Sequence, residues 1–306
     1  MALITVTFLG PAASFSHQAA VESFGTSVEL LARPSFPDAF ASVQHQEVDY
    51  AIVPFENSSN GSVVQTLDLL ADPAGSYPDV RVCGEHYLSV HHCLLARHGQ
   101  HDLNSINKLY THPQAWGQCE RFLSEHFKGV ERQDVSSTSK AAEIVANETA
   151  ERSAAIASRF AAEHHGLDII EENIEDKDNN TTRFLVLRNQ NSERTTRLPF
   201  EKVKVPPTPS PTARKTLISF TVHQNAPGAL ADALLIFKNH GMNLTSINSR
   251  PSQRTPWQYV FLVECQMAPA YDGKEAVAEI LAGLKDATEN SRHLGTWNSM
   301  GSSGAQ

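Results

Sequence analysis

Three short segments in the N-terminal half carry hydroxyl and amide side chains where a predicted strand ends and a predicted helix begins. They are residues 8–16, 53–62 and 135–139. The first turn of a helix leaves backbone N–H groups unpaired, and the helix dipole is positive at that end. Capping alone explains any one segment, because Ser and Asn are preferred N-cap residues. Three such segments in one domain, at strand ends where α/β proteins bind ligands, favour a small anionic ligand such as a dicarboxylate or a phosphate.

A fourth polar segment, residues 179–187, places Thr182 and Arg183 at the entry to a predicted strand. Arg183 could form an ordinary surface ion pair, which contributes little to stability. Alternatively, the Thr182 hydroxyl and the planar guanidinium could bind a carboxylate together. Spacing does not choose between these interpretations. Successive side chains of a regular strand point to opposite faces, so joint action of the pair would require a bend.

A fifth segment, residues 111–119, carries Gln114 and Gln118 on one face of a predicted helix. The same pattern is that of a capped helix with an exposed glutamine pair. Histidines 86, 91, 92, 98 and 101 lie around Cys93, but their spacing matches no zinc pattern, so we predict no metal site. The sequence has no G-x-G-x-x-G and no Walker lysine, which argues against a nucleotide ligand.

Composition limits the class of protein. The chain has 306 residues and a formal charge of -9, and this length fits two domains. The acidic balance and the lack of a Lys/Arg run argue against a nucleic acid or a membrane surface as partner. No apolar run approaches the roughly 20 residues that span a bilayer, and the start lacks the basic segment of a secretory signal. The four cysteines show no C-x-x-C spacing and are expected to be free thiols, so we predict a cytoplasmic location.

Short apolar runs alternate with helical patterns over the first 190 residues, which indicates α/β layers with mostly parallel strands. Predicted strands cover residues 4–9, 28–32, 50–53, 81–96, 108–111, 132–135, 154–157, 167–174 and 184–187. Predicted helices cover residues 14–24, 36–46, 62–70, 113–127, 139–147 and 158–165. Periodicity alone does not decide between one sheet and two lobes.

The pattern changes after residue 190. Residues 189–213 are polar and end in a stretch with four prolines in six residues, which favours an extended linker. Beyond it, predicted strands cover residues 216–222, 243–249, 259–264 and 293–298, and predicted helices cover 228–240 and 274–287. Their order, βαββαβ, is the ferredoxin-like plan. The tail, residues 299–306, is expected to be disordered.

Taken in order, the polar segments resemble the motifs of the prephenate dehydratase family. A G-P-x-x-S-F-S run begins at Gly10, V-P-F-E-N-S at Val53, H-P-Q at His112, S-T-x-x-A-A at Ser137 and T-R-F at Thr182. Five ordered motifs over most of the chain form a specific signal. The family usually carries glycine where this chain has alanine at position 13, next to a serine that keeps the motif's hydroxyl.

The resemblance implies an α/β fold: a two-lobed, periplasmic-binding-protein-like catalytic domain over residues 1–190, then a ferredoxin-like ACT regulatory domain over residues 214–298. The implied lobes are residues 1–80 plus 175–190 and residues 81–174, with the five motifs at the cleft between them. Residues 191–213 would form the linker. No chorismate mutase segment precedes the motifs, so we expect the dehydratase activity alone.

The family reaction converts prephenate to phenylpyruvate with loss of water and CO2, and it needs no metal or coenzyme. The resemblance implies that Thr182 donates a hydrogen bond to the leaving hydroxyl, that Arg183 neutralises charge and that Phe184 shapes the site. The implied substrate-binding residues are Ser14, Phe15, Ser16, Asn57, Ser58, Thr111, Gln114, Gln118, Ser137 and Thr138. Arogenate, with an amino group in place of the keto group, is an alternative substrate. A non-catalytic amino-acid sensor is an alternative of another class.

The ACT resemblance implies feedback inhibition by L-phenylalanine and assembly as a homodimer or homotetramer. The implied effector-binding residues are Gly228, Ala229, Leu230, Asn248, Ser249, Arg250 and Pro251. Asn248 stands where the motif usually has Glu, so a charge that could pair with the effector's amino group is missing.

Overall fold

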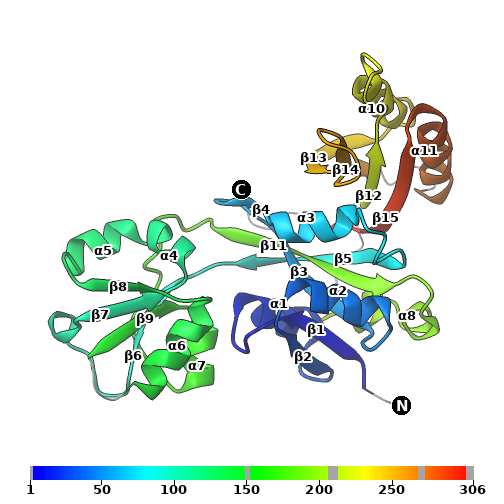
Figure 1. Cartoon of the computed structure of the whole chain (residues 1–306). Coiled ribbons are helices and arrows are strands. Elements are labelled where there is room, and N and C mark those ends of the chain that lie inside the picture. Colours follow the sequence, from blue (N-terminus) through cyan, green and yellow to red (C-terminus); the bar gives the residue numbers. More distant parts are fainter. Residues whose placement is uncertain (1–2, 149–151, 206–212, 268–272, 301–306) are drawn as a thin grey trace.

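The chain folds into two lobes followed by a C-terminal domain (Figure 1). The computed structural model describes residues 3–148, 152–205, 213–267 and 273–300. The proline-rich part of the predicted linker, residues 206–212, and residues 301–306 of the predicted tail lie outside the described residues. In Figure 1 the second lobe lies at the left, the first lobe in the middle and the C-terminal domain at the upper right.

The first lobe contains a sheet in the strand order β5-β11-β3-β1-β2, with β4 beside β3. Its strands are β1 (Thr5–Leu9), β2 (Glu29–Arg33), β3 (Tyr50–Asn57), β4 (Gly61–Ser62), β5 (Val80–Ser89) and β11 (Thr181–Asn189). Its helices are α1 (Phe15–Phe24), α2 (Phe36–Gln44) and α3 (Val64–Ala71). Tyr50 and Ile52 pack on the α1 side of the sheet, whereas Ala51 and Val53 pack on the α2 side. Burial on both faces explains the continuous apolar run of β3.

The second lobe is built on a five-stranded sheet in the order β10-β6-β9-β7-β8. Its strands are β6 (Cys93–Ala96), β7 (Lys108–Thr111), β8 (Glu131–Asp134), β9 (Ser153–Ala157) and β10 (Asp168–Glu171). Its helices are the short η1 (Leu103–Ser105), α4 (Pro113–Gln118), α5 (Glu120–His126), α6 (Thr138–Asn147) and α7 (Arg159–His165). The alternation of strands and helices predicted for this region is confirmed, although the predicted helix over 113–127 is two helices that meet at Cys119.

The chain crosses between the lobes at residues 90–92 and again at residues 172–180. The single strand predicted over residues 81–96 is therefore wrong, because β5 and β6 belong to different sheets. β5 pairs with β11, so the first lobe extends to residue 89 rather than to the expected boundary near residue 80. The crossing segment Val90–His91–His92 contains no Gly or Pro to interrupt the extended pattern, and spacing could not locate it.

Part of the predicted linker belongs to the first lobe. Residues 192–204 form α8 (Glu193–Arg197) and α9 (Phe200–Val203) instead of an extended spacer. Phe200 is buried, and its ring packs against Phe24 and Tyr50. The Tyr50 hydroxyl also donates a hydrogen bond to the backbone carbonyl of Leu198. Burial of the Phe200 ring anchors this segment to the first lobe. The polar composition of the segment did not indicate this packing.

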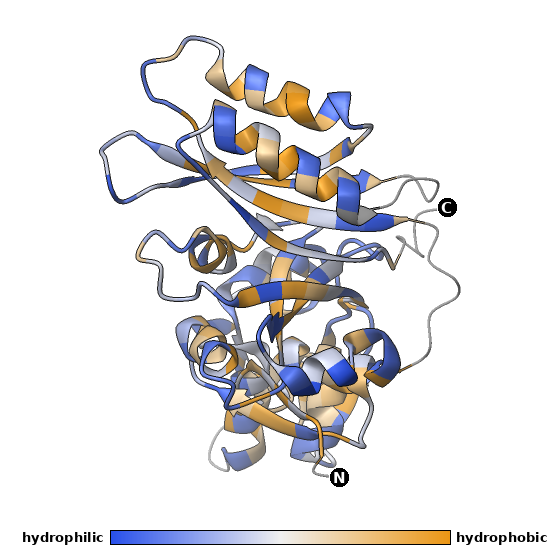
Figure 2. Ribbon diagram, turned by 90° about the vertical axis from the view of Figure 1, so that its right-hand side faces the viewer, coloured by the Kyte–Doolittle hydropathy of each residue, from blue (hydrophilic) through white to orange (hydrophobic). Residues whose placement is uncertain are grey.

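The C-terminal domain confirms the predicted βαββαβ order. Its elements are β12 (Arg214–Thr221), α10 (Ala229–Asn239), β13 (Asn243–Pro251), β14 (Tyr259–Met267), α11 (Gly273–Ala287) and β15 (Asn290–Asn298). Figure 2 shows the two helices side by side on one face of the strands. Phe220 of β12, Phe237 of α10 and Ile280 of α11 are fully buried in the core between them.

A strand pairing joins the C-terminal domain to the first lobe. The sheets of the two units merge into one ten-stranded sheet through a parallel pairing of β15 with β5, at Gly295 opposite Val82. Gly295 has a φ of 144°, and a Cβ there would lie 2.0 Å from the Val82 carbonyl oxygen. Only glycine permits this approach. An ion pair between Arg292 of β15 and Asp72, at 3.2 Å, lies across the same boundary.

We expect Gly295→Ala to destabilise the protein by about 2 kcal/mol, because the added methyl group overpacks the junction and forces β15 away from Val82. Urea unfolding followed by circular dichroism measures the change. Gly241→Ala is the matched control, since Gly241 also has a positive φ of 70° but lies at the end of α10, away from the junction. Equal losses in the two variants would show that backbone strain alone, and not the contact with Val82, accounts for the effect.

Candidate active site

A cavity of about 700 Å³ lies between the two lobes and gathers most of the polar segments. The predicted site residues that line it are Ser14, Phe15, Ser16, Asn57, Gln114, Gln118, Ser137, Thr138, Thr182 and Phe184. They come from α1, β3 and β11 of the first lobe and from α4 and α6, with the residue before α6, of the second. The carboxyl ends of β1 and β3 open into this cavity, as expected for ligand sites of α/β sheets.

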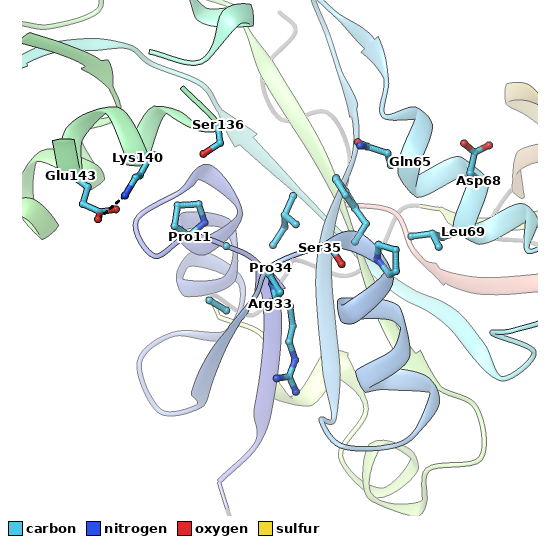
Figure 3. Close-up of a pocket in the computed structure, with 15 residues that line it drawn as sticks. Pro11, Arg33, Pro34, Ser35, Gln65, Asp68, Leu69, Ser136, Lys140 and Glu143 are labelled. Atoms are coloured by element: carbon cyan, nitrogen blue, oxygen red, sulfur yellow. Dashed lines mark hydrogen bonds and ion pairs between the residues drawn. The ribbon is translucent and has the colours of Figure 1, made fainter. Parts of the chain in front are cut away.

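A second cavity, of about 960 Å³, adjoins the first and shares Leu9, Gly10, Phe36, Gln65 and Ser136 with it. Figure 3 shows that Lys140 and Glu143 lie on one side of it and Gln65 and Asp68 on the other. Lys140 and Glu143 form an ion pair of 2.8 Å. This outer cavity therefore brings charged side chains of both lobes to the approach of the inner, neutral one.

α1 of the first lobe and α6 of the second lobe are among the helices that begin at the inner cavity. Ser14 caps α1 by accepting the backbone N–H of His17 at 3.3 Å, and Ser137 caps α6 by accepting that of Lys140 at 3.0 Å. The Ser14 hydroxyl also donates to the Leu9 carbonyl at 3.1 Å, whereas the described residues provide no acceptor for the Ser137 proton, so this hydroxyl and the backbone N–H groups of the first helical turns are left for a ligand. Phe15 and Thr138 stand at those positions and line the cavity. α1 and α6 thus present positive helix ends to the cavity from both lobes.

The Thr182 hydroxyl is fixed by Asn57. The Asn57 Nδ2 donates to Thr182 Oγ1 at 3.0 Å and to Asn180 Oδ1 at 2.8 Å, while Asn57 Oδ1 accepts the backbone N–H groups of Ser59 and Asn60 at 2.9 Å each. The Thr182 oxygen thus acts as an acceptor, and the described residues provide no acceptor for its proton. A hydroxyl held in this way can donate its proton to a ligand in the cavity.

His92 is a cavity residue that sequence reasoning missed, since it was considered only for metal binding. It lies in the first crossing segment, is 1% exposed, and has Nε2 at 2.7 Å from Gln118 Oε1. Its backbone N–H donates to Glu175 Oε2 at 2.8 Å. Burial lowers the pKa of His92 despite the hydrogen bond to Gln118 and the nearby Glu175 carboxylate, so the ring is neutral near pH 7. A neutral Nε2–H donating to Gln118 leaves the amide N–H groups of Gln118 for a ligand.

His112 also lines the cavity without having been predicted as a site residue in its own right. It caps α4, because its Nδ1 accepts the backbone N–H of Gln114 at 3.3 Å. Burial lowers the pKa of His112, and the Asp134 carboxylate opposes this only in part. The described residues that line the inner cavity include no Lys, Arg, Asp or Glu. The cavity is therefore neutral and rich in hydrogen-bond donors.

Two predicted substrate-binding residues do not line the cavity. Thr111 is fully buried, and its hydroxyl donates to the backbone carbonyl of Ile156 at 2.7 Å. The Ser58 hydroxyl donates to the carbonyl of Asn179 at 3.3 Å and accepts the N–H of Thr181 at 2.9 Å. Both side chains satisfy local backbone groups, so their predicted contact with substrate is not supported by their position.

Arg183 points to the opposite side of β11 from Thr182 and Phe184. Its side chain is 4% exposed, and its nitrogens lie 2.7 Å from Glu264, 2.9 Å from Glu56 and 3.3 Å from Glu85. It does not line the inner cavity. The prediction that Arg183 neutralises substrate charge is therefore wrong for this structure, because β11 keeps the alternation of a strand at this point.

The predicted effector residues separate into two places. Gly228, Ala229 and Leu230 line a cavity of about 280 Å³ in the C-terminal domain. Asn248 lines a different cavity, against the first lobe, where the Ser62 hydroxyl donates to its Oδ1 at 2.9 Å. Ser249, Arg250 and Pro251 line neither cavity, and Arg250 forms an ion pair with Asp68 of α3. Within one chain the two predicted effector segments do not meet.

The described residues contain no group of three or more His, Cys, Asp or Glu side chains placed to hold a metal ion. Within the same residues, no helix has the length and apolar character needed to cross a membrane.

Known proteins resemble this chain over most of its length. The sequence profile of the family described as prephenate dehydratase matches residues 6–192. A bifunctional chorismate mutase/prephenate dehydratase of Aquifex aeolicus is 36% identical over 294 residues, which cover 96% of this chain and 73% of that relative. The chain spans about two thirds of the length of other bifunctional relatives.

Two solved structures share the fold. One is a prephenate dehydratase from Arthrobacter aurescens in complex with L-phenylalanine, which has a TM-score of 0.81 and 29% sequence identity to this chain. The match covers 99% of this chain and 92% of the Arthrobacter aurescens chain. GqqA, described as a novel type of quorum quenching acylase, has a TM-score of 0.77 and 28% identity over 96% of this chain and 98% of its own. The match of the family profile to more than half of the chain, together with the identity to the Aquifex aeolicus relative, shows that this chain belongs to the prephenate dehydratase family.

Proposed function

We propose that this protein is a prephenate dehydratase, which converts prephenate to phenylpyruvate, water and CO2 in the inner cavity. The observation that carries the proposal is the Thr182 hydroxyl, held by Asn57 at 3.0 Å with its proton directed to no protein acceptor among the described residues. Family membership supports the same activity. The C-terminal domain would then be an ACT domain that regulates it.

The two carboxylates of prephenate would each bind at one helix N-terminus. α1 belongs to the first lobe and α6 to the second, so the dianion would lie between the lobes and hold them together. Backbone N–H groups and helix dipoles stabilise anions without a lysine or arginine in the cavity. This arrangement suits a protein whose net charge is -9, because local donors rather than overall charge attract the substrate.

In the reaction, the bond between the ring and its carboxylate breaks and releases CO2. The electron pair of that bond enters the ring, the C–O bond opposite it breaks, and the ring becomes aromatic. The departing oxygen carries the electron pair of the C–O bond as hydroxide and must take up a proton to become water. Thr182 would donate a hydrogen bond to this oxygen as its charge develops, which is where a positioned donor lowers the barrier most. Phe184 and Phe15 would limit the access of water.

The neutral lining favours prephenate over arogenate as the substrate. Arogenate carries an ammonium group where prephenate has a keto group, and an ammonium group is best bound by a carboxylate. The described residues of the inner cavity provide none. The amide of Gln118, held by His92, can instead donate a hydrogen bond to a keto oxygen or a carboxylate.

Regulation by L-phenylalanine is part of the proposal. The Arthrobacter aurescens relative was solved with L-phenylalanine bound, and the cavity beside residues 228–230 of this chain could hold a small amino acid. The separation of residues 228–230 from residues 248–251 within one chain supports a homodimer or homotetramer, in which a neighbouring copy completes the effector site. A cytoplasmic location also stays a prediction.

We expect the purified protein to release phenylpyruvate from prephenate, with kcat/KM for arogenate lower by about tenfold or more, since an unpaired buried ammonium group is costly. Ultraviolet detection of phenylpyruvate, and amino-acid analysis of phenylalanine from arogenate, measure the two rates side by side. Higher kcat/KM on arogenate would reverse the assignment of substrate. Tight binding of either compound without turnover would support the amino-acid sensor instead.

Thr182→Ala is expected to lower kcat by about two orders of magnitude, the loss typical of removing one transition-state donor. Thr182→Ser keeps the hydroxyl and is the matched variant, which we expect to stay within about tenfold of the wild type. Circular dichroism spectra and melting temperatures of both variants establish that the fold is retained. An alanine variant as fast as the serine variant would remove Thr182 from the mechanism.

Gly228→Val should raise the L-phenylalanine concentration for half-inhibition by about tenfold or more, a loss of about 1.4 kcal/mol of binding. Gly228 has a φ of 83° at the start of α10, so a β-branched side chain strains the wall of the effector cavity. Gly241→Val, at a φ of 70° but outside that cavity, controls for strain. Calorimetric titration with L-phenylalanine checks binding directly, and unchanged affinity in Gly228→Val would place the effector elsewhere.

A further inference from the structure

A buried group of charges lies directly behind the substrate cavity. We call it the interdomain charge cluster, and it consists of Glu56, Glu85, Arg183, Lys215 and Glu264. Four of these side chains are at most 9% exposed, and Glu56 is 39% exposed. The Lys215 ammonium lies 3.1 Å from Glu85 and 3.7 Å from Glu264, while Arg183 contacts all three carboxylates. Buried ions persist only when they are paired in this way.

The cluster is connected to the cavity through the backbone. Arg183 stands between Thr182 and Phe184, which point to the other side of β11 and line the cavity. Opposite them on β3, Glu56 pairs in register with Arg183 and Asn57 with Thr182. The register between the two strands shifts after Arg183, because β3 carries one extra residue, Phe55, between the partners of Arg183 and Phe184. The ion pair of Arg183 with Glu56 and the hydrogen bond of Thr182 with Asn57 are thus neighbouring links between the same two strands.

The C-terminal domain supplies the strongest partner of Arg183. Glu264 lies on β14, its Oε2 is 2.7 Å from Arg183 Nη1, and its Oε1 accepts the Thr245 hydroxyl at 2.8 Å. Burial by itself lowers the pKa of the Arg183 guanidinium, but the carboxylates outweigh it, with Glu264 contributing most, and the net pKa is raised. The buried charge of Arg183 is thus compensated in part by a residue outside the two lobes.

We propose that Arg183 is a positioning residue for the substrate site and that Glu264 of the C-terminal domain holds it in place. Without the Glu264 charge, the carboxylates left beside Arg183 among the described residues are Glu85 and Glu56, and both lie on strands of the first lobe. The guanidinium would then turn toward them and carry β11 out of register with Asn57. The inference rests on the proposed dehydratase function, and it makes the C-terminal domain a part of the catalytic geometry.

The test is Glu264→Gln, which removes the charge and keeps the shape of the side chain. We expect kcat for prephenate to fall about tenfold or more while KM stays within about threefold, since the hydrogen bond from Thr182 is strongest in the transition state. Arg292→Gln is the matched control. It breaks another ion pair between the C-terminal domain and the first lobe, that with Asp72, but lies on β15 and contacts no residue of the cluster. A kcat loss as large in Arg292→Gln as in Glu264→Gln would reduce the effect to domain docking and overturn the proposal.

A variant cycle separates positioning from general destabilisation. Arg183→Gln and Glu264→Gln should each lower kcat, and the double variant should be no slower than the slower single variant, because both changes break the same contact. Effects on kcat that multiply in the double variant would overturn the proposal. If Arg183→Gln fails to fold, Glu264→Gln and its control still decide the question.

Hydrogen exchange gives a readout that needs no substrate. In Glu264→Gln the amides of residues 181–187 should exchange faster, while in Arg292→Gln they should exchange as in the wild type. Unchanged exchange of this segment in Glu264→Gln would overturn the inference. A wild-type protein without activity on prephenate would refute the proposed function, and the exchange result would then decide separately whether Glu264 holds β11.

Discussion

The buried positive charge of Arg183 constrains the whole architecture. An unpaired ion with a side chain 4% exposed would be strongly destabilising, so the strands around it must provide carboxylates. They come from β3, β5 and β14, and the last of these belongs to the C-terminal domain. The approach of β15 to β5 at Gly295, which no other residue permits, brings that domain close enough for Glu264 to reach the cation. Packing and electrostatics thus impose the same placement of the domain.

Because successive side chains of β11 point to opposite faces, the buried charge of Arg183 lies next to the candidate active site along the strand. One face of the strand carries Thr182 and Phe184 into a neutral cavity, and the other carries Arg183 into the charge cluster. The two environments are separated only by the backbone of the strand. A charge that would strongly attract a dianion is thereby kept out of the cavity, which presents helix N-termini and amide groups instead. Such donors bind anions without the desolvation cost of a buried arginine.

The two lobes contribute different parts of the candidate site. The first lobe holds the Asn57–Thr182 pair and the N-terminus of α1, while the second provides the N-terminus of α6 and Gln118. His92 lies in the segment that crosses between them and orients Gln118 through one hydrogen bond. A site assembled from both lobes and their connection binds its ligand only when the lobes are correctly placed, which explains why the anchoring residues are spread over most of the N-terminal domain.

The sequence by itself determined much about this protein. Alternating strands and helices, the βαββαβ order and the polar segments at helix starts follow from local periodicity and capping, so the fold class and residues such as Ser14, Asn57 and Ser137 could be predicted. The role of Thr182 came from the resemblance of its motif to that of the family. Only the tertiary structure decided where the Arg183 side chain points and that His92 lines the cavity. It also showed that the Thr111 and Ser58 hydroxyls form hydrogen bonds with backbone groups. Packing of the Phe200 ring, which anchors residues 192–204, could likewise be seen only in the folded chain. The same was true of the crossing at residues 90–92, which separates β5 from β6. The physical reason is that local patterns reflect the chain's own neighbours, whereas each of these outcomes depends on a partner that lies far away in the sequence, as Glu264 does from Arg183.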